Sequence, residues 1–180
     1  MVPGIVFLLD VDNTLLDNDR IVADLGLHLI RAFGADSPAR FWAIFEALRT
    51  ELGYADYLGA LQRYRADVER LDGGEEPLLS VSSFLIDYSF ADRLYPQALE
   101  VVAHLGRIGQ TVILSDGDVV FQPRKVHRSG LWRAVHGRVL IYPANLARYP
   151  AADISVERIA DLLGFDAARW RTAMTSETSS

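Results

Sequence analysis

The chain has 180 residues, half of them hydrophobic, and a formal net charge of −6. This length can bury one core and a small additional lobe, while the acidic balance argues against a nucleic-acid or anionic-membrane surface. Because the sequence contains no cysteine, disulfides, thiolate metal sites and cysteine nucleophiles are excluded. The apolar N-terminal run has no basic flank and ends at Asp10, so we expect a cytoplasmic protein without signal peptide or membrane span.

The first predicted element is a strand over residues 5–9, whose five consecutive apolar residues are typical of a strand buried on both faces. Asp10 and Asp12 follow it. Their i, i+2 spacing points both carboxylates the same way from the carboxyl end of the strand, where open α/β sheets bind ligands. Two adjacent acids favour a divalent cation that neutralises their repulsion. From these residues alone, a solvated turn after an edge strand is the alternative.

Between residues 17 and 92 the sequence predicts only helices. Apolar residues recur there every three to four positions, and glycines or polar loops separate the periodic segments. The predicted helices cover residues 20–33, 37–52, 55–70 and 78–88. A strand is the alternative for 78–88, and the helix is favoured because no turn pairs this segment with a neighbour. Their aromatic residues fit the core of a small helical lobe better than a cofactor site.

The second half of the chain alternates between helices and strands. A helix is predicted over residues 96–108, and a β-rich run at 110–114 ends in the polar residues 115–118. The next helix carries Lys125, the only lysine in the sequence, and a third strand is predicted at 137–142. This order describes an α/β fold, a parallel sheet with a helical insertion after its first strand.

Three motifs in this order resemble the haloacid dehalogenase-like (HAD) hydrolase superfamily. Its first motif, Asp-x-Asp-x-Thr after a hydrophobic strand, is matched by Asp10, Asp12 and Thr14. The second, a strand ending in Ser or Thr, is matched at Ser115, and the third, a lysine on the next helix, at Lys125. Because these motifs lie at strand ends, we expect the two aspartates, the serine and the lysine to meet in one pocket between the sheet and the helical lobe.

The resemblance also implies a domain organisation. A Rossmann-like three-layer α/β core would comprise residues 1–16 and 93–180. The helices of residues 17–92 would form a small cap domain. Nothing in the cap helices identifies a substrate.

The resemblance implies a Mg²⁺-dependent hydrolase of phosphoric monoesters, with a small phosphorylated molecule as substrate. Asp10 would attack phosphorus to give an aspartyl-phosphate, and Asp12 would protonate the leaving group and then activate water. The superfamily's dehalogenases lack an acid at the position of Asp12, so this acid favours phosphate. Asp10 and Asp12 would hold Mg²⁺, Asp12 through its backbone carbonyl, together with the phosphate. The other implied site residues are Ser115 and Lys125 in catalysis and Thr14, Asp116 and Gly117 in substrate binding, where backbone amides near Gly117 would hold phosphoryl oxygens.

The superfamily's fourth motif, a buried strand that closes in an acidic pair and completes the Mg²⁺ site, has no match after Tyr142. Residues 154–164 have helical spacing instead, and Asp153 is an isolated acid. We therefore expect a helix there, an unpaired edge on the first strand and weak metal binding. This helix or a partner protein could cover the unpaired edge of the first strand. The third alternative, that the chain lacks its natural C-terminus, is the one we favour.

Two other functions remain open. A phosphomutase or another phosphotransferase would pass the phosphoryl group to a second hydroxyl rather than to water. A catalytically impaired relative would only bind phosphate or a protein, and the missing fourth motif supports this reading. The sequence leaves the oligomeric state open.

Overall fold

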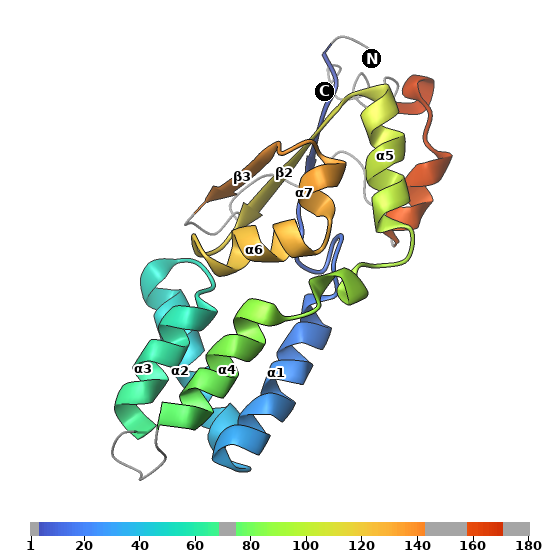
Figure 1. Cartoon of the computed structure of the whole chain (residues 1–180). Coiled ribbons are helices and arrows are strands. Elements are labelled where there is room, and N and C mark those ends of the chain that lie inside the picture. The colour runs from blue at the N-terminus through green and yellow to red at the C-terminus, as the bar shows by residue number, and fades with distance from the viewer. Residues whose placement is uncertain (1–3, 69–74, 143–157, 171–180) are drawn as a thin grey trace.

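The computed structural model describes residues 4–68, 75–142 and 158–170. Its three parallel strands form one sheet in the order β1-β2-β3 (Figure 1). They are β1 (Val6–Leu9), β2 (Gln110–Asp116) and β3 (Val139–Tyr142). The predicted α/β fold with a helical insertion after its first strand is confirmed.

The insertion consists of four helices that lie together beyond the carboxyl ends of the strands (Figure 1). They are α1 (Asn18–Phe33), α2 (Ser37–Leu52), α3 (Tyr57–Val68) and α4 (Glu75–Asp87). Helix α1 forms because apolar residues recur every fourth position on its buried face and Asp17 caps its first turn. All four helices were predicted, and aromatic residues such as Phe41, Phe45 and Tyr64 form much of their shared core, as expected.

Helices cover one face of the sheet. They are α5 (Ala98–Ile108), α6 (Phe121–Arg128) and α7 (Leu131–Ala134), and all three lie on the same side of the strands in Figure 1. Phe7 and Leu9 of β1 point to this side and are buried. The expectation that β1 is buried on both faces is wrong, because Val6 and Leu8 on the other side are 54% and 60% exposed. Two of the three expected layers are thus present in the described part of the chain.

Strand register brings the first two motifs together. Leu9 at the end of β1 lies beside Ile113 of β2, and the two strands run in the same direction. The residues that follow Leu9 therefore lie at the carboxyl end of the sheet, close to Ser115 and Asp116. Within residues 4–68, 75–142 and 158–170, β1 pairs only with β2. Residues 143–157 and 171–180, on which the expectation of an unpaired edge also depends, lie outside the described residues.

Some short elements were not predicted. The 3-10 helix η1 (Phe90–Arg93) and helix α7 have four residues each, which is too few to show a periodicity. The expected α-helix over 154–164 is a 3-10 helix, η2 (Ile159–Gly164), where the structure describes it. Residues 154–157 and Asp153 lie outside the described residues.

The chain crosses between the sheet and the insertion at two adjacent points. The backbone N–H of Asp17 donates to the Arg93 carbonyl at 2.8 Å, and that of Tyr95 donates to the Leu15 carbonyl at 3.0 Å. Across the same crossing, the Tyr88 hydroxyl and Arg93 Nη2 both donate to the Asp24 carboxylate. We propose that the domain boundaries lie at these crossings, at 16/17 and 92/93.

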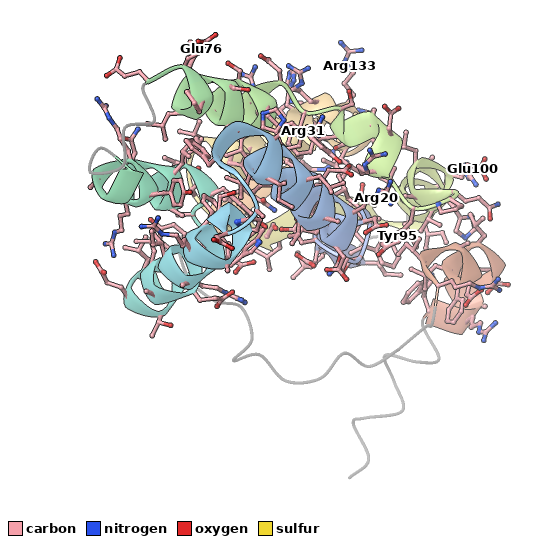
Figure 2. All side chains as sticks on the ribbon, turned by 90° about the horizontal axis from the view of Figure 1, so that it is seen from below. Arg20, Arg31, Glu76, Tyr95, Glu100 and Arg133 are labelled. Carbon is pink, nitrogen blue, oxygen red and sulfur yellow. The ribbon has the colours of Figure 1, made fainter. Side chains whose placement is uncertain are left out.

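Several charged side chains project from the outer surface. Figure 2 shows Glu76, Glu100 and Arg133 pointing away from the body of the molecule. Among the residues that the structure describes, no helix combines the length and the apolar character needed to cross a membrane.

The contacts of Asp24 generate a pH-dependent prediction. Burial raises the pKa of Asp24, but the hydrogen bonds of Tyr88 and Arg93 and the charges of Arg93 and Arg20 outweigh it, so the net pKa is lowered. The Asp24→Asn variant should lose about 1 kcal/mol of unfolding free energy at pH 7. Since a lowered pKa stabilises above the ordinary value near 4, this difference should vanish as the pH falls through the native pKa.

Urea denaturation at pH 7 and pH 3 measures this difference. Glu51→Gln is the control, because its ion pair with Arg63 is exposed and should contribute little. An equal loss for Asp24→Asn at both pH values would contradict the assignment.

Candidate active site

The turn after β1 holds the two motif aspartates beside each other. The backbone N–H of Leu15 donates to the Val11 carbonyl at 3.0 Å, and that of Asn13 donates to the Leu16 carbonyl at 2.8 Å. Asn13 has a positive φ of 56°, a conformation that asparagine tolerates better than most residues. The tight turn leaves Asp10 and Asp12 half-buried between the sheet and the insertion.

Lys125 reaches this turn from α6. Its side chain is 0% exposed, and its Nζ donates to Asp12 Oδ1 at 2.7 Å and to Asn18 Oδ1 at 3.0 Å. The ammonium also lies 5.2 Å from the centroid of the Phe121 ring. A buried ammonium needs such partners, because an unpaired one would be strongly destabilising.

Hydroxyl groups surround Asp10. Thr14 Oγ1 donates to Asp10 Oδ2 at 3.0 Å, and Ser115 Oγ lies 3.4 Å from Asp10 Oδ1. Burial raises the pKa of Asp10, the charges of Asp12 and Asp116 raise it further, and hydrogen bonds from Val11 and Thr14 oppose the rise. Two of the aspartates, the serine and the lysine therefore converge as expected.

Gln122 belongs to the same cluster, although the sequence motifs do not include it. It is 3% exposed, and its Nε2 donates to Ser115 Oγ at 2.9 Å and to Asp12 Oδ2 at 3.3 Å. It thus connects the first two motifs. Its spacing could have indicated this position, because Gln122 lies three residues before Lys125 and so shares a helix face with it.

Asp116 is the last residue of β2, and Gly117 follows it. Burial raises the pKa of Asp116, and the charge of Asp12 adds to the rise. The Gly117 N–H donates to the Tyr142 carbonyl at 3.2 Å. Binding of phosphoryl oxygens by the amides around Asp116 and Gly117 stays a prediction. Gly117 has a φ of 142°, and a Cβ there would lie 2.9 Å from Cβ of Gln122, so glycine permits their close packing.

The oxygen donors of Asp10 and Asp12 fit a hard divalent cation. Within the described ranges, no three acidic, histidine or cysteine side chains gather in a metal-binding arrangement. An ion at Asp10 would therefore need backbone, water and substrate oxygens as further ligands. Mg²⁺ commonly binds through one or two carboxylates with water and phosphate oxygens, so these residues fit Mg²⁺.

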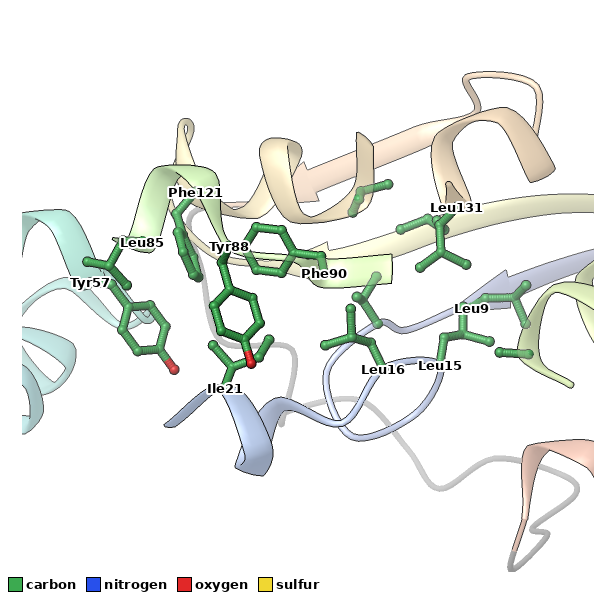
Figure 3. Packing of buried hydrophobic residues seen from close by; sticks show 14 of the residues in the cluster. Leu9, Leu15, Leu16, Ile21, Tyr57, Leu85, Tyr88, Phe90, Phe121 and Leu131 are labelled. Carbon is green, nitrogen blue, oxygen red and sulfur yellow. The ribbon is translucent and has the colours of Figure 1, made fainter. Parts of the chain in front are cut away.

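Helix α6 also fixes the insertion to the core. Arg124 Nε donates to the Ile86 carbonyl, and Arg128 Nη2 donates to the Asp87 carbonyl at 3.2 Å, both at the C-terminus of α4. Phe121 of α6 packs against Tyr57 of α3, with ring centroids 4.9 Å apart (Figure 3). The helix that carries Lys125 is thus in contact with both parts of the molecule.

The chain is similar over most of its length to a solved structure from Burkholderia xenovorans LB400 that is assigned to the haloacid dehalogenase-like hydrolases. The two are 47% identical, the match covers 92% of this chain and 97% of that chain, and the TM-score is 0.78. A scan against protein-family models finds no match, and neither does a search of curated proteins.

Two more distant structures share the fold. The HAD-hydrolase YfnB from Bacillus subtilis, bound to magnesium, is 19% identical with a TM-score of 0.51, covering 76% of this chain and 62% of that chain. L-2-haloacid dehalogenase from Xanthobacter autotrophicus is 20% identical with a TM-score of 0.50, covering 79% of this chain and 60% of that chain. The chain thus spans less than two thirds of the length of each.

The Lys125–Asp12 pair generates a stability prediction. Lys125→Met should leave Asp12 unpaired and lower the unfolding free energy by about 2 kcal/mol, less than for a fully buried pair because Asp12 is partly exposed. Adding Asp12→Asn should recover part of the loss, since the uncompensated charge is then gone.

Urea denaturation at pH 7 measures Lys125→Met, Asp12→Asn and the double variant. Arg128→Met, on the same helix but with an exposed side chain, is the control and should lose less. If the double variant is as unstable as the sum of the two single variants, the two side chains are not coupled.

Proposed function

The chain belongs to the haloacid dehalogenase-like hydrolase superfamily, and we propose that it is a Mg²⁺-dependent phosphatase of a small phosphorylated molecule. The observation that carries the proposal is the Lys125–Asp12 contact of 2.7 Å directly beside Asp10. A nucleophilic carboxylate, a second carboxylate for proton transfer and a fixed ammonium are the groups that phosphoryl transfer to an enzyme carboxylate needs.

In the proposed first step, a carboxylate oxygen of Asp10 attacks phosphorus. A bond from Asp10 to phosphorus forms, the bond from phosphorus to the ester oxygen breaks, and Asp12 gives the leaving oxygen a proton. The hydroxyls of Thr14 and Ser115 orient the Asp10 carboxylate. Lys125 and Ser115 would stabilise the charge on the phosphoryl oxygens.

In the second step, Asp12 takes a proton from water, and the water oxygen attacks the phosphorus of the aspartyl-phosphate. The bond from phosphorus to Asp10 breaks, which releases inorganic phosphate and restores the enzyme. Asp10 and Asp12 would hold Mg²⁺, which supplies positive charge against the repulsion between Asp10 and the phosphate.

The alternatives differ in the phosphoryl acceptor. A phosphotransferase would form the same aspartyl-phosphate but pass it to a substrate hydroxyl, so products formed with added alcohols or sugars would separate the two. A binding protein would hold phosphate without turnover. The two carboxylates beside a fixed ammonium favour hydrolysis, because binding alone does not need a proton donor next to the nucleophile.

The nucleophile generates the first activity prediction. Asp10→Asn should lower hydrolysis of an aryl phosphate by roughly a thousandfold or more, since an amide oxygen is a poor nucleophile. Initial rates in the presence of Mg²⁺ measure the loss. Asp92→Asn, an exposed acid on η1, is the control and should keep full activity. Equal rates for Asp10→Asn and the wild type would exclude Asp10 as nucleophile.

Metal dependence generates the second activity prediction. Chelation should abolish hydrolysis, and added Mg²⁺ should restore it. Calorimetry should show weak Mg²⁺ binding that strengthens when orthovanadate is present, because Asp10 and Asp12 need phosphate-like oxygens as further ligands. Tight Mg²⁺ binding without an oxyanion would contradict this donor set.

A further inference from the structure

We propose that Asn18 and Tyr57 are positioning residues for Lys125, so that helix α3 of the insertion fixes the Lys125 ammonium against Asp12. Neither residue belongs to the motifs that define the site. The consequence for catalysis rests on the proposed phosphatase function, whereas the network of contacts does not. It begins at the ammonium group and ends on the ring of Tyr57.

Lys125 Nζ carries three hydrogens, and the described contacts engage two of them. One points to Asp12 Oδ1 at 2.7 Å and one to Asn18 Oδ1 at 3.0 Å. With two directions fixed, the third N–H of the ammonium is fixed as well, and it remains for a phosphoryl oxygen. Asn18 therefore determines where the charge of Lys125 points, although it does not touch the reacting atoms.

Asn18 is itself fixed on both sides. It is the first residue of α1, next to the crossing between sheet and insertion, and its backbone N–H donates to Asn13 Oδ1 at 2.9 Å. Because an ammonium can only donate, the amide oxygen of Asn18 faces Lys125, and its NH₂ group is left to donate. The Tyr57 hydroxyl lies near the Asn18 side chain, whose influence opposes the rise in the pKa of Tyr57 that burial causes.

Tyr57 connects this network to the insertion. It is 5% exposed, and burial raises its pKa to about 12, so the hydroxyl stays protonated at neutral pH. Its ring lies 4.9 Å from the Phe121 ring on α6 and 4.7 Å from the Phe45 ring on α2, measured between centroids. Figure 3 shows Tyr57 beside Phe121 at the boundary between insertion and core.

Tyr57 thus acts on Lys125 through two routes. Its ring packs on Phe121, one turn before Lys125 on the same helix, and its hydroxyl lies near Asn18, which accepts a hydrogen bond from Lys125. If Tyr57 were only a packing residue, its hydroxyl would be dispensable. Tyr57→Phe keeps the ring and removes the hydroxyl, so this variant separates positioning from packing.

The single lysine of the chain permits a direct measurement. Lysine labelled with ¹⁵N at the ζ position gives one side-chain NMR signal, that of Lys125, in the intact protein. Tyr57→Phe should shift this signal and speed hydrogen exchange of the ammonium with water severalfold. Asn18→Ala should do the same to a larger extent. Tyr64→Phe, which removes a buried hydroxyl two turns along α3, is the matched control and should leave the signal unchanged.

Kinetics on an aryl phosphate then tests the catalytic consequence. Tyr57→Phe should lower kcat by about tenfold with little change in KM, because a misplaced ammonium weakens transition-state stabilisation more than binding. Adding Tyr57→Phe to Lys125→Met should cause no further loss, since the positioned group is already absent. Thermal unfolding of each variant shows that it is folded.

The two sets of measurements distinguish the possible failures. An unchanged Lys125 signal in folded Tyr57→Phe and Asn18→Ala overturns the positioning role, whatever the activity. A shifted signal in a protein without any phosphatase activity supports the network and overturns the proposed function. Additive losses in the double variant also overturn the positioning role, because Tyr57 would then act independently of Lys125.

Discussion

The burial of one ammonium group constrains the rest of this molecule. Lys125 is 0% exposed, and a buried charge is tolerated only where fixed partners compensate it. Both partners lie far from Lys125 in the sequence, Asp12 after β1 and Asn18 at the start of α1. The first strand, the insertion and helix α6 must therefore be in place together before the charge is compensated. The site is therefore complete only when the first strand, the insertion and helix α6 have folded together.

The sheet register supplies the other half of the site. Since β1 and β2 are parallel, Asp10 and Ser115 leave the same sheet edge, with their oxygens 3.4 Å apart. Gln122 then connects Ser115 to Asp12 from the helix that also carries Lys125. Each group is held by a neighbour from a different element. A substitution of any one of these groups should therefore change the positions of its hydrogen-bonded neighbours.

Elements with a regular apolar spacing, and residues in known motifs, could be predicted from the sequence. The four helices of the insertion follow from apolar spacing, and the convergence at Lys125 follows from motifs at strand ends. The uncovered face of β1 could not be predicted, because an apolar run such as 5–9 does not show which of its faces is packed. Gln122, Asn18 and Tyr57 were not recognised as site residues, since their contacts span the boundary between separate elements. The hydrogen bond from the Gly117 amide to the Tyr142 carbonyl could not be predicted, because it depends on how β2 and β3 pair in the folded chain.

The paired crossings between sheet and insertion have an evolutionary consequence. Because Leu16 and Leu94 form an antiparallel bridge, the chain leaves the core and returns to it at neighbouring positions. The distance between neighbouring strands, about 5 Å, is short enough for a loop of a few residues to span. The insertion can therefore be lengthened, shortened or exchanged between proteins without a change in the sheet. Sequence and length can therefore vary most easily in a segment that leaves the core and returns to it at neighbouring positions.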